Sequence, residues 1–135
     1  MRKLFGIGYS TSAFNIATLI LRLGSGALML PHGYDKLVKF KTMTPHFMPF
    51  LGLSPEISLA LVVFAEFFCS ILVILGLMTR FACIPLIIDT FVALGKGHDF
   101  DLFGKGEHAA LFLTIFLGLL FVGPGRISID GMIKK

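Results

Sequence analysis

Four long apolar runs divide the chain, and polar segments separate them: Ala13–Pro31, Ile57–Met78, Phe81–Leu94 and His108–Val122. Each run is predominantly apolar along its length and shows no regular alternation of apolar and polar residues. This pattern is typical of helices that satisfy their own backbone hydrogen bonds in a bilayer, and it argues against a β-barrel. It predicts an all-α fold, an integral membrane four-helix bundle in a single domain spanning residues 1–135. The expected helices cover about residues 13–33, 57–78, 81–96 and 107–123.

The last two runs are shorter than the hydrocarbon core of a bilayer, which is about 30 Å thick. Flanking residues must therefore help them to span, with Arg80 and Lys96 extending to the interface at the two ends of the third run. The alternative is a re-entrant pair. Spanning is favoured because a polar loop long enough to emerge from the bilayer joins the two runs.

Proline and glycine mark the expected helix ends. Pro31 with Gly33 is expected to close the first helix, and Gly123-Pro124-Gly125 is expected to end the fourth. The loop between the first two helices, residues 34–56, interleaves apolar side chains with lysines. That composition predicts a segment that lies in the membrane interface, or a cap packed over the bundle.

Composition agrees with a membrane protein. Hydrophobic residues make up 56% of the chain and the mean hydropathy is +0.89, whereas a soluble domain is about 45–50% apolar. The net charge of +4 does not indicate nucleic-acid binding, because the basic residues are scattered beside the apolar runs. Cys69 and Cys83 lie in apolar runs without a CxxC motif, so they are expected to be small buried side chains.

The distribution of basic residues gives an expected orientation. With four spans, both termini lie on the same side of the membrane. That side would carry Arg2, Lys3, Arg80, Arg126, Lys134 and Lys135, and the other side would carry Lys36, Lys39, Lys41, Lys96 and Lys105. The small excess predicts a multi-pass protein of the plasma (inner) membrane with both termini in the cytoplasm.

Three charged residues interrupt the apolar runs: Arg22, Glu66 and Asp89. Charges inside a membrane are costly, so they are normally paired or face a cavity, and they are candidates for function. Counted at 1.5 Å per residue from one side, all three lie at a similar depth. An Arg22–Glu66 or Arg22–Asp89 pair is therefore expected. Such a pair would either lock the helices together or line a polar cavity for a proton, a small polar ligand or a quinone head group.

Helical spacing adds a polar face to the first helix. Asn15, Thr18, Arg22, Ser25 and His32 follow one another at steps that trace one side of a helix. We expect this face to turn towards the interior of the bundle.

A second group of polar residues belongs to the end of the expected bundle that lies away from the two termini. It comprises His32, Lys36, His98, Asp99, Asp101, Glu107 and His108. Histidine and carboxylate side chains can bind zinc or relay protons. Their spacing matches no defined metal signature, so no metal site is predicted. His32, Lys36, Glu107 and His108 remain candidates for binding on that side.

Several short motifs, taken in order, resemble the DoxX family of small membrane proteins. They are Arg22 in the first helix, His32-Gly33-Tyr34-Asp35-Lys36-Leu37, Glu66, Leu75-Gly76-Leu77-Met78-Thr79-Arg80, Gly106-Glu107-His108-Ala109-Ala110-Leu111, and Gly123-Pro124-Gly125-Arg126-Ile127-Ser128-Ile129-Asp130. The resemblance covers almost the whole chain. Asp89 and His108 stand outside the family pattern.

The resemblance implies a helical bundle in the membrane and a link to redox chemistry. The first hypothesis is an accessory or partner-binding subunit of a membrane redox system acting on thiols, sulfur or oxidative stress, with membrane or periplasmic redox proteins as partners. The second is an oxidoreductase that couples thiosulfate or another small sulfur compound to a quinone, held near Arg22 and Glu66. The third is a transporter of protons or small solutes, for which a homo-oligomer is expected because four helices rarely enclose a wide pore. Fold-level kinship alone does not decide among them.

Overall fold

The computed structural model of the protein describes residues 2–47, 52–97, 104 and 106–133. The regular elements in these ranges are all helical, which confirms the all-α prediction. The segments Thr11–Val38 and Pro55–Leu75 are long and apolar enough to cross a membrane, and Glu107–Val122 is a shorter apolar helix. The number of helices that cross the bilayer stays a prediction.

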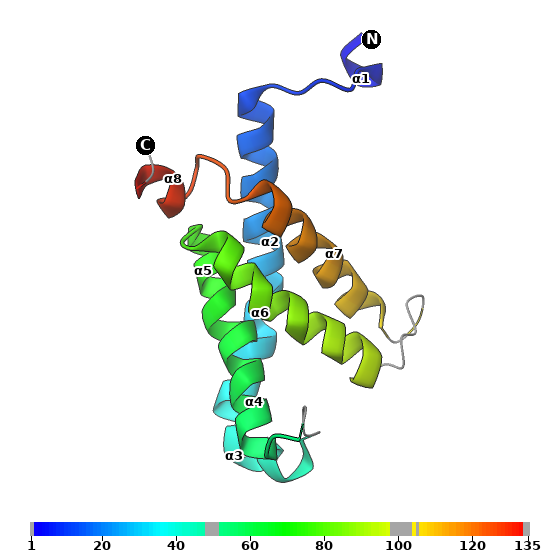
Figure 1. Ribbon diagram of the computed structural model, residues 1–135, viewed down its shortest axis with the longest axis vertical. Helices are drawn as coiled ribbons and strands as arrows, with labels where there is room; N and C mark the ends of the chain where they lie inside the picture. Colours follow the sequence, from blue (N-terminus) through cyan, green and yellow to red (C-terminus); the bar gives the residue numbers. More distant parts are fainter. Residues whose placement is uncertain (1, 48–51, 98–103, 105, 134–135) are drawn as a thin grey trace.

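The chain folds back on itself as long helical segments that alternate in direction (Figure 1). These segments are α2 (Thr11–Val38); α4 (Pro55–Val63), which continues through the π-helical η2 (Phe64–Cys69) into α5 (Ser70–Leu75); α6 (Thr79–Val92) with the π-helical η3 (Ala93–Gly97); and α7 (Glu107–Val122). Short helices complete the chain: α1 (Arg2–Phe5), α3 (Phe40–Met43), η1 (Thr44–His46) and α8 (Ile129–Ile133). The beginning and the end of the chain lie at the same end of the molecule (Figure 1).

The first helix does not end at Pro31 and Gly33, as the sequence predicted. It continues to Val38, with Pro31 in its interior. Proline removes one backbone N–H and crowds the carbonyl of the preceding turn. Membrane helices tolerate this loss when neighbouring helices and small local adjustments satisfy the freed groups. The additional turn places Lys36 on α2.

Side chains and glycine define the helix ends. Ser10 and Ser54 cap α2 and α4, each accepting a hydrogen bond from a backbone N–H of the first turn. At the end of α5, Gly76 adopts a left-handed conformation with φ of 72°. The N–H groups of Gly76 and Leu77 donate to the carbonyls of Val73 and Leu72. This Schellman motif ends the helix sharply and leads into α6.

Glycines on α2 let its backbone approach the η2–α5 segment closely. A Cβ atom on Gly33 would lie 2.5 Å from the main chain of Glu66 and Phe67. A Cβ atom on Gly26 would lie 3.1 Å from the carbonyl oxygen of Ser70. These contacts fix the antiparallel register of the two segments, since a larger residue at either position would force them apart.

Buried apolar side chains from these helices form the hydrophobic core. The core comprises Met29, Cys69, Val73, Ala82, Cys83, Leu86, Phe116 and Leu119. Both cysteines are fully buried free thiols. They fill the core as small side chains.

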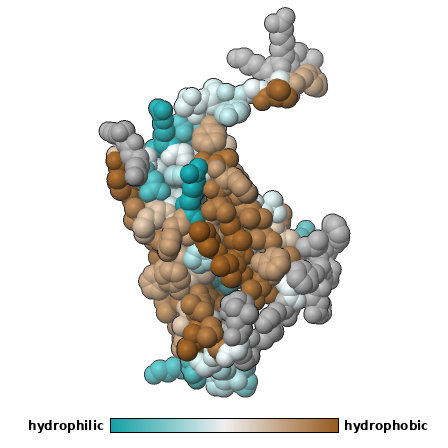
Figure 2. All heavy atoms as spheres, in the orientation of Figure 1, coloured by the Kyte–Doolittle hydropathy of each residue, from teal (hydrophilic) through white to brown (hydrophobic). Residues whose placement is uncertain are grey.

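Large apolar side chains also cover the outside of the helices. Figure 2 shows a broad hydrophobic band over the middle of one face, with hydrophilic residues towards its two ends. Over the molecule as a whole, the exposed large apolar side chains include Ile20, Leu28, Phe64, Phe68, Phe81, Ile88, Phe91 and Phe121. An apolar exterior on this scale is unfavourable in water and is typical of a surface that faces lipid or a partner.

The close approach at Gly33 generates a prediction about stability. Gly33→Ala should lower the free energy of unfolding by about 1–3 kcal/mol, because the new methyl group meets the main chain of η2. Thermal unfolding of the protein in detergent micelles, followed by circular dichroism, measures this change.

Gly24→Ala is the matched control. Gly24 also lies in α2, but a Cβ atom there meets no atom within 4 Å. Alanine should leave stability unchanged or raise it by up to about 1 kcal/mol through its higher helix propensity. Equal melting temperatures for the two variants would show that the helices are not in contact at Gly33.

Candidate functional site: two buried polar clusters

Arg22 is almost completely buried, with 1% of its surface exposed. Its partners are main-chain carbonyl groups. Nη1 donates to the carbonyl oxygens of Val73 at 3.3 Å and Ile74 at 3.2 Å, and Nη2 donates to that of Ile127. Val73 and Ile74 belong to the last turn of α5, which carries the negative end of the helix dipole. The Val73 carbonyl accepts from Arg22 in addition to the N–H of Gly76. Arg22 therefore joins α2 to the end of α5 and to the C-terminal segment.

The predicted pairing of Arg22 with Glu66 or Asp89 is wrong. Arg22 lies level with Ile74, and Glu66 stands eight residues earlier in the same helical segment. Eight residues correspond to about 12 Å along a helix axis. The depth count was wrong because it assumed that the first helix starts level with the end of the second, taking Ala13 and Met78 as the same depth. In the structure the first turns of α2 extend beyond the α5–α6 turn (Figure 1).

The polar face of α2 near Arg22 holds the C-terminal segment. Asn15 accepts a hydrogen bond at 3.0 Å from the main-chain N–H of Arg126. Gly125, with φ of 80°, passes so close to Thr18 that a side chain at this position would collide with the Thr18 hydroxyl. The inward face predicted from helical spacing is therefore occupied by the protein's own chain at this end of the molecule.

Asp130 strengthens the same connection from the other side. Its two carboxylate oxygens accept hydrogen bonds from the N–H groups of Met78 at 2.8 Å and Thr79 at 3.0 Å, at the start of α6. Its own N–H donates to the carbonyl of Gly76. A carboxylate at a helix N-terminus satisfies free N–H groups and favours the dipole. The sequence analysis did not identify this role of Asp130.

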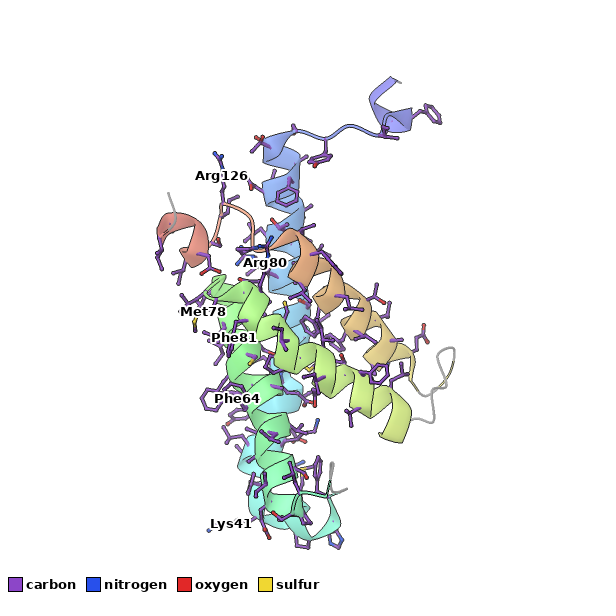
Figure 3. All side chains as sticks on the ribbon, viewed as in Figure 1. Lys41, Phe64, Met78, Arg80, Phe81 and Arg126 are labelled. Atoms are coloured by element: carbon purple, nitrogen blue, oxygen red, sulfur yellow. The ribbon has the colours of Figure 1, made fainter. Side chains whose placement is uncertain are left out.

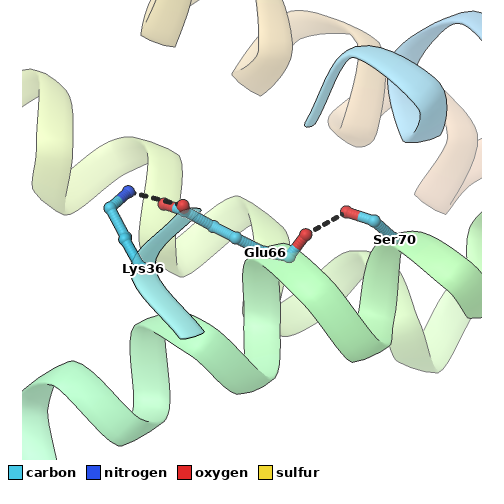
Figure 4. A network of polar contacts seen from close by, with 3 residues as sticks. All are labelled: Lys36, Glu66 and Ser70. Atoms are coloured by element: carbon cyan, nitrogen blue, oxygen red, sulfur yellow. Dashed lines mark hydrogen bonds and ion pairs between the residues drawn. The ribbon is translucent and has the colours of Figure 1, made fainter. Parts of the chain in front are cut away.

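The second cluster joins Lys36, Glu66 and Asp89. Lys36 Nζ lies 2.5 Å from Glu66 Oε1, and Glu66 is 5% exposed. The Asp89 side chain on α6 lies close to the carboxylate of Glu66. Figure 4 shows the Lys36–Glu66 contact and the hydrogen bond from the Ser70 hydroxyl to the Glu66 carbonyl. The cluster therefore links α2, η2 and α6.

Local structure explains how Lys36 and Glu66 meet. Gly33 lies against the backbone of Glu66, and Lys36 follows on the same face of α2 at a spacing of three residues. Glu66 sits in the wider turns of η2, and π-helical turns of this kind are frequent at functional sites. The spacing of Gly33 and Lys36 could have revealed the pair, if the first helix had been extended beyond Pro31.

The other predicted residues of this end remain apart. His32 is exposed and its ring packs edge-on against Phe112 of α7. Glu107 and His108 are exposed in the first turn of α7. His98, Asp99 and Asp101 lie outside the described residues. Within the described ranges, no three His, Cys, Asp or Glu side chains are grouped to hold a metal ion.

The fold and its charged core define a small helical membrane protein, and comparison with known proteins gives its family. The model of the DoxX family matches residues 17–99. The chain is 31% identical to an uncharacterized membrane protein, Rv3486, of Mycobacterium tuberculosis, over 88% of this chain and 82% of the relative. No solved structure matches. This protein belongs to the DoxX family.

The contacts of Arg22 generate the second prediction. Arg22→Lys should lower the free energy of unfolding by at least about 2 kcal/mol, because one ammonium group cannot reach both the end of α5 and Ile127. Arg126→Lys changes an exposed arginine in the same way and should stay within about 0.5 kcal/mol of the wild type. Thermal unfolding in detergent compares them, and similar melting temperatures for both variants would argue against the structural role of Arg22.

The third prediction concerns the Lys36–Glu66 pair. Lys36→Met leaves a buried carboxylate without its cation and should cost about 3–5 kcal/mol. Combining it with Glu66→Gln should recover most of that loss, since the uncompensated charge is removed. Thermal unfolding of the two single variants and the double variant measures the coupling.

The exposed pair Lys39–Asp35 supplies the control for this cycle. Its atoms lie 3.0 Å apart, and both side chains are more than half exposed, at 59% and 56%. Lys39→Met should therefore cost no more than about 0.5 kcal/mol. Additive effects of Lys36→Met and Glu66→Gln would show that their charges are not coupled.

Proposed function

We propose that this protein is an accessory, partner-binding subunit of a membrane redox system. The observation that supports this proposal is the bonding of Arg22 to main-chain carbonyl groups. Its guanidinium is engaged by carbonyls of the protein's own helix end and C-terminal segment, so it serves to hold the fold together. A residue buried in this way is not presented to a substrate. The redox association itself comes from kinship with the DoxX family.

The proposed setting is a four-helix transmembrane bundle in the plasma membrane, with both termini in the cytoplasm. The alternating direction of the long helices and the apolar exterior support it. Arg80 and Arg126 lie at the end where the termini lie, as the positive-inside rule would require. A partner would contact the apolar exterior within the membrane, or the helix ends outside it.

The alternative hypothesis, a quinone-coupled oxidoreductase, is weakened because the two residues expected to hold the quinone lie apart. That hypothesis placed the quinone head group near Arg22 and Glu66 together, whereas Arg22 contacts Ile74, about two helical turns from Glu66. The cation beside Glu66 is Lys36, and it already makes an ion pair.

One observation favours proton transport as a second function. The carboxyl groups of Glu66 and Asp89 lie close to each other beside Lys36, at a point where apolar helices meet. Buried carboxyl groups of this kind occur in proton relays of pumps and transporters.

A single set of preparations tests these functions, and this is the fourth prediction. Protein tagged at a terminus and solubilised gently from its native membranes should migrate on a native gel as a complex larger than the isolated chain. The complex should contain a protein with a redox cofactor or a reactive dithiol. The isolated chain should carry no quinone and should show no thiosulfate-dependent reduction of added quinone.

Proteoliposomes containing a pH-sensitive dye distinguish the transport function. Wild-type protein and Asp89→Asn should leave the internal pH equally stable under an imposed gradient. Proton flux that Asp89→Asn abolishes would replace the accessory role with transport. Quinone reduction that Glu66→Gln abolishes, while Lys39→Met preserves it, would instead establish an enzyme.

A further inference from the structure

A groove of about 990 Å³ opens beside the start of α6, at the end of the molecule where the termini lie. One wall is the first turn of α6, and the other runs from Pro124 into α8. Its lining includes Met78, Arg80, Phe81, Arg126, Asp130 and Met132. None of these side chains belongs to the Lys36–Glu66–Asp89 cluster.

The groove presents positive charge. Arg80 and Arg126 are both exposed, and within the described ranges neither has a carboxylate at ion-pair distance. Asp130 also lines the groove, and its two carboxylate oxygens accept hydrogen bonds from the backbone N–H groups of Met78 and Thr79. One guanidinium nitrogen of Arg80 donates to the Phe121 carbonyl at 3.3 Å, which steadies the side chain and leaves its other donors available.

Large apolar side chains stand next to these arginines. Met78, Phe81 and Met132 are 51%, 58% and 68% exposed. Figure 3 shows Arg126, Arg80, Met78 and Phe81 in this order from the end of the molecule towards its middle. Charge therefore lies towards the end of the molecule and apolar surface towards the hydrophobic band of Figure 2.

We propose that this groove binds an anionic phospholipid. Arg80 and Arg126 hold the phosphate of the headgroup, since guanidinium groups form strong paired hydrogen bonds with phosphate oxygens. The acyl chains follow Met78 and Phe81 towards the bilayer core. Arginines towards the end of the molecule and apolar side chains towards its middle match the headgroup and acyl chains of a lipid in its leaflet. An acidic protein segment would bind the arginines without needing the apolar side chains in this order. The inference rests on the proposed membrane placement and not on the accessory role.

The lipid specificity of the isolated chain tests the proposal, as the fifth prediction. The full-length protein is purified in a non-ionic detergent, and native mass spectrometry counts bound lipid during titration with phosphatidylglycerol or with phosphatidylcholine of the same chains. Phosphatidylglycerol should bind more tightly. Arg80→Gln and Arg126→Gln should each weaken its binding about fivefold, as expected for one basic residue near an anionic lipid surface.

Control variants separate the groove from general charge. Lys39→Gln and Lys41→Gln together remove two charges at the opposite end of the molecule, where Figure 3 places Lys41, and should leave binding unchanged. Arg80→Lys keeps the charge but not the paired hydrogen bonds, and it should bind the lipid more tightly than Arg80→Gln does. Arg126→Gln makes no change to the contact between Arg80 and Phe121, so it tests the groove even where Arg80→Gln disturbs folding.

Four results would overturn the proposal. They are equal binding of the two lipids, full binding by the Arg80→Gln/Arg126→Gln double variant, an equal loss in the lysine double variant, and displacement of the lipid by inorganic phosphate at similar concentration. The last result would indicate a site for free phosphate. The assay contains no redox partner, so its failure would leave the accessory role untouched, and failure to find a partner would leave the lipid site untouched.

Discussion

The structure depends on one buried guanidinium. Arg22 donates hydrogen bonds to carbonyls at the end of α5 and to the carbonyl of Ile127, which lies 105 residues later in the chain. Carbonyl groups at a helix end have no partners within the helix, and inside a membrane protein no bulk water replaces them. Arginine suits this task because its rigid planar group offers several donors to different acceptors at once. Without it, α2, α5 and the C-terminal segment would lose the hydrogen bonds that join them through Arg22.

The same solution recurs at this end of the molecule. Arg80 donates to the Phe121 carbonyl in the last turn of α7, and Asp130 accepts from the first N–H groups of α6. Each charged side chain reaches the end of a helix other than its own, with a sign that suits the helix dipole. The helix ends are thereby tied to one another, and the polar residues Asn15 and Thr18 receive the C-terminal segment alongside them.

The Lys36–Glu66–Asp89 cluster has a different character. It joins side chains to side chains, and it lies where α2, the π-helical turns of η2 and α6 meet. Buried ion pairs add little net stability, since desolvation offsets much of the attraction, yet they are costly to break. They are therefore well suited to fixing the arrangement of helices. This cluster, rather than Arg22, is the part of the core where chemistry could occur.

The sequence by itself determined the helical class, the apolar exterior, the family motifs and the presence of buried charges, because these follow from residue type and short-range spacing. The expectation that Arg22 needs partners also came from residue type alone. The identity of those partners came only from the tertiary structure. Pairing depends on the register between helices, which is fixed by the close approach at Gly26 and Gly33 and by how far α2 extends beyond the α5–α6 turn. The apolar pattern of the sequence contains neither the helix register nor the length of this extension, so the depth count paired Arg22 with Glu66. In the folded protein, helix packing places Lys36 beside the Glu66 carboxylate, and Arg22 bonds to main-chain carbonyls.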